Sequence, residues 1–286
     1  MNEQALKDRL KHIAAEQNRS FQEVWKLFLL ERFLVRLSHS KYNEQLVFKG
    51  GLLLSYYLVI ARETTDIDLL ARHFQAEMHQ IQNILIEICN IPVNDSIDMS
   101  FECVDALDHN HMNYPGYRVK LNARYGKMRD RIQIDIGVGD VVESIQIDWP
   151  LFQYKAQPLF EDYISLHVYP VETIFSEKLE TIIARGAANS RMKDFHDVIL
   201  LCRKLTVIDR EKLNNSIRKT FMTRDTTIEI PVVFSDDEYL RLQRLWAAHL
   251  RTLEASTKET LRLPENISSV VHEINTSLSH VMSFEE

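Results

Sequence analysis

The sequence predicts an α+β protein in which a sheet with flanking helices is followed by a domain made of helices. Residues 117–124 and 131–138 alternate between apolar and polar side chains on either side of a glycine-containing turn, which predicts an antiparallel strand pair. After about residue 150, apolar positions recur every three or four residues, as they do in helices. We therefore expect two domains, residues 1–165 with the sheet and residues 166–286 with the helices.

The chain begins with two predicted helices. Apolar residues at helical spacing predict the first over residues 2–17. Ser20 and Glu23 have the spacing of a capping box, in which each side chain accepts a hydrogen bond from the backbone amide of the other residue. This box opens a second helix that ends near Ser38. Trp25 lies on this helix and is expected in the core.

A short apolar strand, residues 46–48, leads into a glycine pair and then an apolar helix over residues 52–60. The first amides of a helix have no partner within the helix, so Gly50 and Gly51 would present N–H groups to an anion. Lys49 would add a positive charge beside them. The alternative is a plain turn, which a glycine pair alone predicts equally well.

Asp66 and Asp68 stand one residue apart on the next predicted strand. Side chains alternate along a strand, so both carboxylates face one way while Ile67 and Leu69 face the other. Two like charges on one face of an apolar strand repel each other, and a divalent cation between them removes that cost. Carboxylate oxygens suit Mg²⁺, with Mn²⁺ as the alternative ion. A solvated pair at a strand end is the competing interpretation.

A third carboxylate occurs farther along the chain. A helix is predicted over residues 74–91 and a strand over residues 97–104, both before the strand pair. In the second strand of the pair, Asp135 lies on one face and the isoleucines of that strand lie on the other. Asp135 beside the first two aspartates would complete a two-metal site and could accept a proton from an attacking hydroxyl. Asp140 follows it in a glycine turn. Taken alone, Asp135 is also compatible with an exposed strand residue.

The strand pair carries the most basic stretch of the chain, in which six cations surround a single acid, Asp130. The cations are Arg118, Lys120, Arg124, Lys127, Arg129 and Arg131. Clustered cations on a strand face predict contacts with phosphate. A solvated run of charges is an alternative of equal weight.

The helical domain contributes a lysine and two acids. Lys178 lies on the apolar stripe of a helix over residues 170–184, and a lysine there either extends into solvent or meets an anion. Asp194 and Asp197 are expected as surface neighbours near the start of the next helix, where acids complement the helix dipole. The rest of the chain is expected to form helices, one of them opened by a second capping box at Ser235–Glu238.

Composition excludes several classes of protein. The 286 residues carry a net charge of −7, so a contact with nucleic acid would depend on local basic patches. Three dispersed cysteines, Cys89, Cys103 and Cys202, indicate neither a disulfide framework nor a zinc site. The first residues are charged, unlike a signal peptide, and the longest apolar run is too short to span a bilayer. We expect a cytoplasmic protein without membrane contact.

Six blocks of the sequence together resemble the AbiEii/AbiGii family, the nucleotidyltransferase-like toxins of bacterial abortive-infection and toxin–antitoxin systems. The blocks occur in family order between about residues 45 and 205. They are Lys49-Gly50-Gly51, Thr65-Asp66-Ile67-Asp68-Leu69, Tyr114-Pro115-Gly116-Tyr117-Arg118-Val119, Ile134-Asp135-Ile136-Gly137, Tyr169-Pro170-Val171-Glu172-Thr173 with Glu177-Lys178-Leu179, and Arg191-Met192-Lys193-Asp194-Phe195-His196-Asp197. The resemblance implies a polymerase-β-type nucleotidyltransferase core, with a mixed or antiparallel sheet and helices, followed by an α-helical domain.

The resemblance also implies a role for each matching residue. The residues implied at the nucleoside triphosphate are Lys49, Gly50, Gly51, Lys178 and Asp197. The residues implied at the metal are Asp66, Asp68 and Asp135. The residues with an implied catalytic role are Asp66, Asp68, Asp135, Lys178 and Asp194. Leu52 departs from the pattern, because many nucleotidyltransferases have Ser or Thr after the glycines and thus one more hydroxyl contact to phosphate.

The implied activity is Mg²⁺-dependent transfer of a nucleotide from an NTP to an acceptor, which for some family members is the 3′ end of tRNA. A cognate antitoxin is the implied protein partner. Two alternatives stay open. One is a nucleotidyltransferase-like scaffold that binds nucleotide, RNA or protein without chemistry, which the acidic net charge and Leu52 favour. The other is an enzyme that transfers phosphoryl or nucleotidyl groups to proteins or small molecules.

Overall fold

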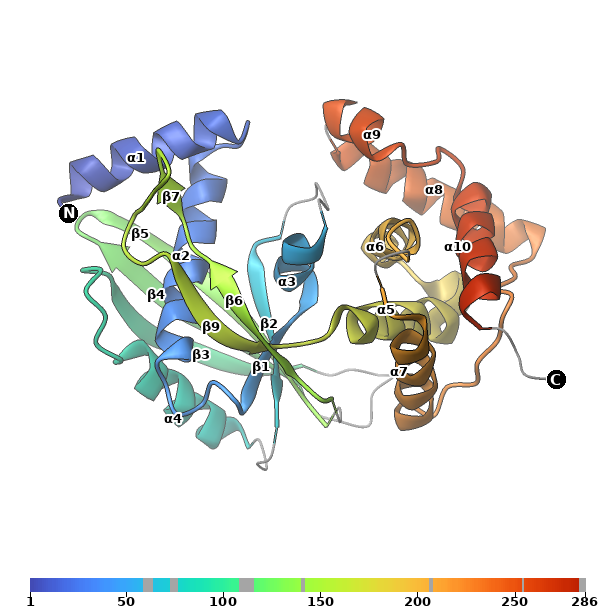
Figure 1. Cartoon of the computed structure of the whole chain (residues 1–286), viewed down its shortest axis with the longest axis horizontal. Coiled ribbons are helices and arrows are strands. Elements are labelled where there is room, and N and C mark those ends of the chain that lie inside the picture. The colour runs from blue at the N-terminus through green and yellow to red at the C-terminus, as the bar shows by residue number, and fades with distance from the viewer. Residues whose placement is uncertain are drawn as a thin grey trace. The chain divides into compact units, whose positions relative to one another are not determined.

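The computed structural model describes seven stretches of the chain (Figure 1). They are residues 1–58, 64–72, 77–107, 116–139, 142–205, 208–253 and 255–282. The chain divides into two compact units, one made of Met1–Leu53 with Thr64–Tyr169 and one made of Leu54–Glu63 with Pro170–Glu286. Four predicted features lie wholly or partly outside the described residues. They are the end of the apolar helix at residues 59–60, the first residues, 74–76, of the helix predicted over 74–91, the block start Tyr114-Pro115, and Asp140.

The first unit begins with two helices, α1 (Glu3–Glu16) and α2 (Phe21–Ser38), where helices were predicted. The Ser20 hydroxyl accepts a hydrogen bond from the Glu23 amide, and the Glu23 carboxylate accepts one from the Ser20 amide. This reciprocal pair confirms the predicted capping box. Trp25 is only 3% exposed and stacks on a neighbouring aromatic ring, so its expected place in the core is confirmed.

Seven strands form one sheet in the order β3-β4-β5-β2-β1-β9-β6 (Figure 1). Their bounds are β1 (Leu46–Lys49), β2 (Asp66–Ala71), β3 (Asp98–Leu107), β4 (Gly116–Tyr125), β5 (Met128–Val138), β6 (Ile145–Pro150) and β9 (Tyr163–Val168). The pairs β2–β5 and β1–β9 are parallel, and the other neighbours are antiparallel. A mixed sheet with helices confirms the α+β class, and β4 with β5 is the predicted strand pair.

The segment that follows β5 differs from the prediction, which expected helices after about residue 150. The edge strand β6 ends at residue 150, and the chain then forms β7 (Gln153–Tyr154), β8 (Gln157–Pro158) and β9 in place of helix. Most residues of β6 are exposed because it lies at the end of the sheet. Residues 145–149 of β6 (Ile-Gln-Ile-Asp-Trp) and residues 164–168 of β9 both alternate between apolar and polar side chains, so the sequence does carry the two-residue pattern of a strand here.

One face of the sheet is apolar and buried. Ile132, Ile134 and Ile136 on β5 are at most 1% exposed, as their alternation predicted. The helix α2 packs on β5 and β9, and α4 (Met78–Cys89) packs on β3 (Figure 1). Burial of these apolar side chains is the main favourable term for folding of the unit. Because side chains alternate, Asp135 stands on the opposite, polar face of the sheet.

A buried ionic cluster joins α2 to the segment that precedes β3. Asp95 is 1% exposed and accepts two hydrogen bonds from Arg36, at 2.8 and 3.0 Å, and one from Arg32 Nε at 3.0 Å. The Ile97 amide donates a further bond to Asp95 at 2.9 Å. Three charged groups in the interior are tolerated only because each of them has close partners of opposite sign or polar partners.

We expect Asp95→Ala to lower the free energy of unfolding by about 3–5 kcal/mol, because it removes the carboxylate that the buried Arg36 and Arg32 share, although Arg32 keeps its pairing with Glu161. Asp98→Ala is the matched control, since it removes an exposed carboxylate that pairs with Arg124 on the same sheet. That control should cost less than about 1 kcal/mol. Urea unfolding of both variants measures the difference, and similar midpoints for the two would contradict the prediction.

Glu31 on α2 gives the first unit a pH-dependent stability. Burial raises the pKa of this carboxyl from 4.5 to about 8, although Arg32 and the Phe152 amide, which donates at 2.6 Å, both lower it. The unfolded chain loses this proton near its ordinary pKa, whereas the folded protein keeps it, so stability contributed by the group falls as pH rises from 4.5 to about 8. Below about pH 4.5 the carboxyl is protonated in both the folded and the unfolded state, so stability no longer changes with pH through this group.

Glu31→Gln is therefore expected to stabilise the protein at about pH 8.5 relative to the wild type, and much less at about pH 5. The amide oxygen can still accept the hydrogen bond from Phe152. Urea midpoints at the two pH values, with the exposed Glu44→Gln as control, check the sign. The same change in midpoint at both pH values would show that Glu31 titrates normally.

The second unit is helical in its described residues from Pro170 onward. Its helices are α5 (Val171–Arg185), the short 3₁₀ helix η1 (Gly186–Ala188), α6 (Met192–Cys202), α7 (Arg210–Thr223), α8 (Asp236–Thr252), α9 (Ala255–Leu261) and α10 (Ile267–Val281). Ser235 and Glu238 form the second predicted capping box. Throughout the described ranges, helices that combine the length and apolarity needed to cross a membrane are absent.

Candidate active site

The predicted carboxylate strand is β2. Ile67 and Leu69 are 0% and 1% exposed, and Asp66 and Asp68 are half-buried on the other face. This alternation is what the pattern predicted, and it follows from the two-residue repeat of a strand. The two carboxylates therefore stand together on the polar face of the sheet.

Gly50 brings the start of α3 (Gly50–Tyr57) directly against Asp68. Lys49, the last residue of β1, pairs with Asp68 in antiparallel register, and the chain enters the helix at the next residue. Gly50 has φ +81°, a conformation that favours glycine. A Cβ at this position would lie only 1.9 Å from Asp68 Oδ2. The contact excludes any side chain and sets the first turn of α3, which contains Gly51, beside a carboxylate.

Lys49 is anchored by an aromatic residue at the end of β9. Its Nζ lies 3.2 Å from the Tyr169 hydroxyl and 4.6 Å from the centre of the Tyr169 ring. Tyr169 is fully buried, and its amide donates to the Phe48 carbonyl at 2.9 Å. The predicted cation thus lies at the glycine turn, and the strand pairing of β1 with β9 fixes its position.

Asp135 lies opposite Asp68 on the neighbouring strand. β2 and β5 run parallel, with Asp68 paired to Asp135 and Asp66 paired to Gln133, so the three acids share one face. Asp135 accepts two hydrogen bonds from Arg118, from Nε to Oδ1 at 2.9 Å and from Nη2 to Oδ2 at 2.7 Å. The side-chain amide of Gln133 donates a third hydrogen bond, to Oδ1, at 3.3 Å. The third carboxylate is next to the others but is held by an arginine.

The donor chemistry of the pair Asp66 and Asp68 fits a divalent cation, because both supply hard carboxylate oxygens. Asp135 does not complete a larger ligand group in this arrangement. In the part of the chain that the structure describes, no cluster of three or more His, Cys, Asp or Glu residues has a geometry that could hold a metal ion. Both oxygens of Asp135 accept from Arg118 instead. Its expected role at a metal stays a prediction.

The basic stretch on β4 and β5 is largely paired with acids. The pairs are Arg118–Asp135, Lys120–Asp105, Arg124–Asp98 and Arg131–Glu102. Lys127 and Arg129, near the turn between the strands, are exposed. A set of cross-strand ion pairs accounts for most of the stretch, and phosphate contact stays a prediction for the exposed turn.

The second unit gathers Lys178, Asp194 and Asp197. Lys178 Nζ lies 3.2 Å from Asp194 Oδ1 and 2.8 Å from Asp197 Oδ2. Arg191 Nε lies 2.9 Å from the other oxygen of Asp194. Of the two outcomes expected for a lysine on an apolar stripe, Lys178 therefore meets an anion, and the anion belongs to its own chain.

The predicted surface position of Asp194 and Asp197 is wrong. Their side chains are 1% and 0% exposed, because α6 packs against α5 and α10. Burial of two carboxylates is costly unless cations accompany them, and Lys178 and Arg191 supply the charge. The predicted site residues thus form two groups, one on the sheet of the first unit and one between α5 and α6 of the second.

Sequence reasoning missed the partners that hold the predicted residues. Arg118 was assigned to a basic patch, although counting back from the turn at Gly126 places it opposite Asp135 in the strand pair. That count was the available signal. The contact of Tyr169 with Lys49 was missed because β9 was not predicted, and the available signal for β9 was the alternation of Ile164, Leu166 and Val168 with polar residues.

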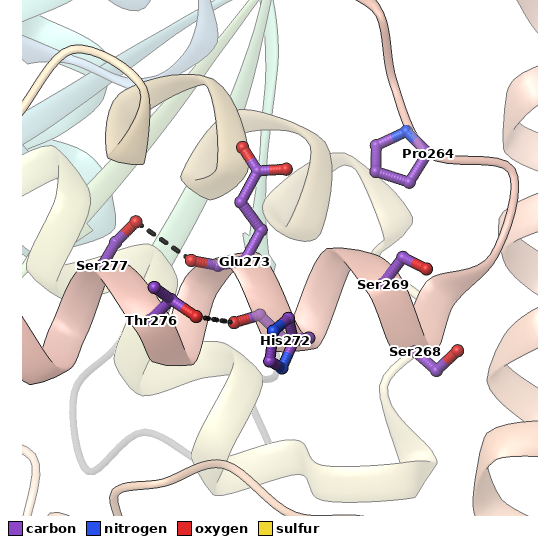
Figure 2. Close-up of a pocket in the computed structure, with 7 residues that line it drawn as sticks. All are labelled: Pro264, Ser268, Ser269, His272, Glu273, Thr276 and Ser277. Carbon is purple, nitrogen blue, oxygen red and sulfur yellow. Dashed lines mark hydrogen bonds between the residues drawn. The ribbon is translucent and has the colours of Figure 1, made fainter.

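A separate cavity of about 610 Å³ lies along α10 (Figure 2). Hydroxyl-bearing residues and His272 line it, and none of the predicted site residues does. The Ser277 hydroxyl donates to the Glu273 carbonyl and the Thr276 hydroxyl to the His272 carbonyl, so both are used within the helix (Figure 2). This cavity carries no arrangement suited to catalysis.

Comparison with known proteins identifies the family. A family model described as the nucleotidyl transferase AbiEii toxin of type IV toxin–antitoxin systems matches residues 32–270. Curated proteins give no match. Among solved structures, JHP933 from Helicobacter pylori is 13% identical with a TM-score of 0.45, and the similarity covers 92% of each chain. A candidate nucleotidyltransferase from H. pylori is 13% identical with a TM-score of 0.44, covering 92% of this chain and 95% of that one. Because the family model spans well over half of its residues, the chain belongs to the AbiEii family of nucleotidyl transferase toxins of type IV toxin–antitoxin systems.

Proposed function

We propose that this nucleotidyltransferase uses Mg²⁺, or Mn²⁺ in its place, to transfer a nucleotide from an NTP to a hydroxyl at the 3′ end of an RNA, with tRNA as the favoured acceptor. The observation that carries the proposal is the contact of Gly50 with Asp68. It sets a helix start, which binds phosphate through its amides, beside the carboxylates that suit a divalent ion.

Each proposed residue has a distinct task. Asp66 and Asp68 would hold the divalent ion, which when bound would offset the negative charge of the phosphates. The amides of Gly50 and Gly51 bind phosphate oxygens of the nucleotide, and Lys49 adds a positive charge at the same turn. Catalysis then comes mainly from positioning and from charge stabilisation.

The remaining assignments rest on the family resemblance. Lys178 is proposed to offset charge on the departing pyrophosphate, with Asp194 and Asp197 as the acids that hold its ammonium group. The tRNA acceptor is proposed on the same ground, and the exposed Lys127 and Arg129 are candidates for contact with its backbone. A cognate antitoxin is the proposed protein partner.

The test incubates the purified chain with each α-labelled NTP, Mg²⁺ and total RNA, and then separates the RNA on a denaturing gel. We expect label in a tRNA-sized band with at least one NTP, and loss of that label when the metal is chelated. Asp68→Asn should reduce the labelling by about 100-fold or more, because it removes a carboxylate proposed to hold the metal ion that offsets the charge of the transition state.

Asp98→Asn is the matched control, since Asp98 is an exposed carboxylate at the start of β3 on the same sheet. It should label RNA as the wild type does. Undiminished labelling by Asp68→Asn, or no labelling by the wild type with any NTP and RNA, would contradict the proposal.

A further inference from the structure

Arg118 binds the carboxylate of Asp135, which was predicted as the third metal ligand. Asp68, Asp135 and Arg118 follow one another across three adjacent strands, β2, β5 and β4, in paired register. Paired residues share a face of the sheet, so the arginine stands at the end of a row of acids. The guanidinium group of Arg118 donates one hydrogen bond to each carboxylate oxygen of Asp135, from Nε at 2.9 Å and from Nη2 at 2.7 Å.

All three acids act on this one guanidinium group. Hydrogen bonding with Asp135 is the largest cause that raises the pKa of Arg118, and the charges of Asp135, Asp66 and Asp68 raise it further against partial desolvation. The arginine thus supplies positive charge to the row of acids. A bound cation would supply the same charge from another position.

Asp135 in this pair is a weaker metal ligand and a weaker base than a free carboxylate, because three of its roughly four acceptor positions are used by Arg118 and Gln133 and the adjacent guanidinium charge disfavours binding of a second cation or a proton. Phosphate offers the guanidinium fork an equivalent partner, since arginine binds phosphates and carboxylates with the same geometry. The Arg118 side chain is 38% exposed, so it can exchange one partner for the other without leaving a buried position. Asp135, at 19% exposure, would then face Asp68 without the arginine.

We propose that Arg118 is a positioning residue that holds Asp135 while the site is empty and moves to the triphosphate when nucleotide and metal bind, which releases Asp135 to the metal. This inference rests on the proposed function and adds to it an exchange of partners within the site. It makes the third carboxylate available only when substrate charge is present. The cation site is completed by the nucleotide and is weak without it.

The test measures binding and not turnover. Mn²⁺ is titrated into the nucleotide-free protein and followed by electron paramagnetic resonance, and inorganic triphosphate is titrated without metal by calorimetry. Arg118→Gln should bind Mn²⁺ about fivefold or more tightly than the wild type, because Asp135 is released, and should bind triphosphate about fivefold or more weakly. The double variant Arg118→Gln/Asp135→Asn should lose the gain in Mn²⁺ affinity.

Arg124→Gln is the matched control, because Arg124 also lies on β4 and donates two hydrogen bonds to an acid, Asp98, outside the row. It should leave both affinities unchanged. Arg118→Lys keeps the charge but loses the two-pronged hydrogen bonding, so its affinities for Mn²⁺ and triphosphate should lie between those of the wild type and Arg118→Gln. It replaces the glutamine variant in the test if that variant does not fold.

The outcomes separate this inference from the proposed function. Wild-type Mn²⁺ binding that Arg118→Gln or Arg118→Lys leaves unchanged would overturn the exchange alone. Absence of Mn²⁺ binding in both the wild type and Arg118→Gln, or binding that Asp68→Asn does not weaken, would overturn the metal site and the proposed function together with it.

Discussion

Gly50→Ala is expected to reduce nucleotidyl transfer by about 100-fold or more, because it displaces the carboxylate at the proposed metal site. Gly50 has φ +81°, and a Cβ there would meet Asp68 Oδ2 at 1.9 Å. Either the Asp68 side chain or the first turn of α3 must move. Both are parts of the same proposed site, so neither adjustment preserves it. Single-turnover labelling of RNA measures the effect.

Gly186→Ala is the control that separates backbone strain from loss of the site. Gly186 also has positive φ, at +49°, but an added Cβ would have nothing within 4 Å. Its substitution should cost about 1–3 kcal/mol of stability, because alanine rarely adopts this backbone conformation, and should leave transfer unchanged. If Gly50→Ala and Gly186→Ala had equal activity, the contact of Gly50 with Asp68 would have no role in the reaction.

Lys178→Met is expected to lower the free energy of unfolding by about 3–5 kcal/mol and to abolish transfer. The substitution leaves Asp194 and Asp197, which are 1% and 0% exposed, without the ammonium group that lies 3.2 and 2.8 Å from them. Stability is measured by urea unfolding. Activity is measured at a temperature where the variant is still folded.

The two effects can be separated by a second substitution. Lys178→Met/Asp197→Asn removes one of the uncompensated charges and should recover part of the lost stability, but it should stay inactive because the proposed cation at the pyrophosphate is still missing. Arg224→Met is the matched control: Arg224 is 9% exposed and pairs with Glu177 and Glu180 in the same unit. It should lose stability and keep transfer. Recovery of activity in the double variant would show that Lys178 is structural only.

The strands that form the site could be predicted because local pattern determines them. A half-buried strand alternates, so the shared face of Asp66 and Asp68 and the polar side of Asp135 followed from the apolar residues between them. The capping box at Ser20 and Glu23 is equally local, since both partners lie within one turn of helix.

Contacts between distant elements could not be predicted in the same way. Asp194 and Asp197 have a pattern suited to an exposed helix start, and only the packing of α5 against α6 reveals that Lys178 lies between them. The strands β6 and β9 are only six residues long each, and they were not predicted although both alternate between apolar and polar side chains. Without β9, the prediction lacked the strand pairing that brings Tyr169 to Lys49.

The glycine pair illustrates what structure adds to a motif. A glycine turn before a helix is common, and by itself it predicts no particular chemistry. In the structure, position 50 requires glycine because Asp68 Oδ2 occupies the space that a Cβ would need. The glycine turn, which is the proposed phosphate site, and the carboxylate strand are therefore in direct contact, so a change to either displaces the other.

The most direct test of the central claim asks which phosphorus of the NTP reaches the acceptor. RNA is incubated with the chain and Mg²⁺ in parallel reactions that contain NTP labelled at the α- or at the γ-phosphate. A nucleotidyltransferase with Asp68 at its centre should place only the α label on RNA, release the γ label as pyrophosphate, and lose the transfer in Asp68→Asn. Appearance of the γ label on the acceptor, or α labelling that Asp68→Asn leaves intact, would contradict the account.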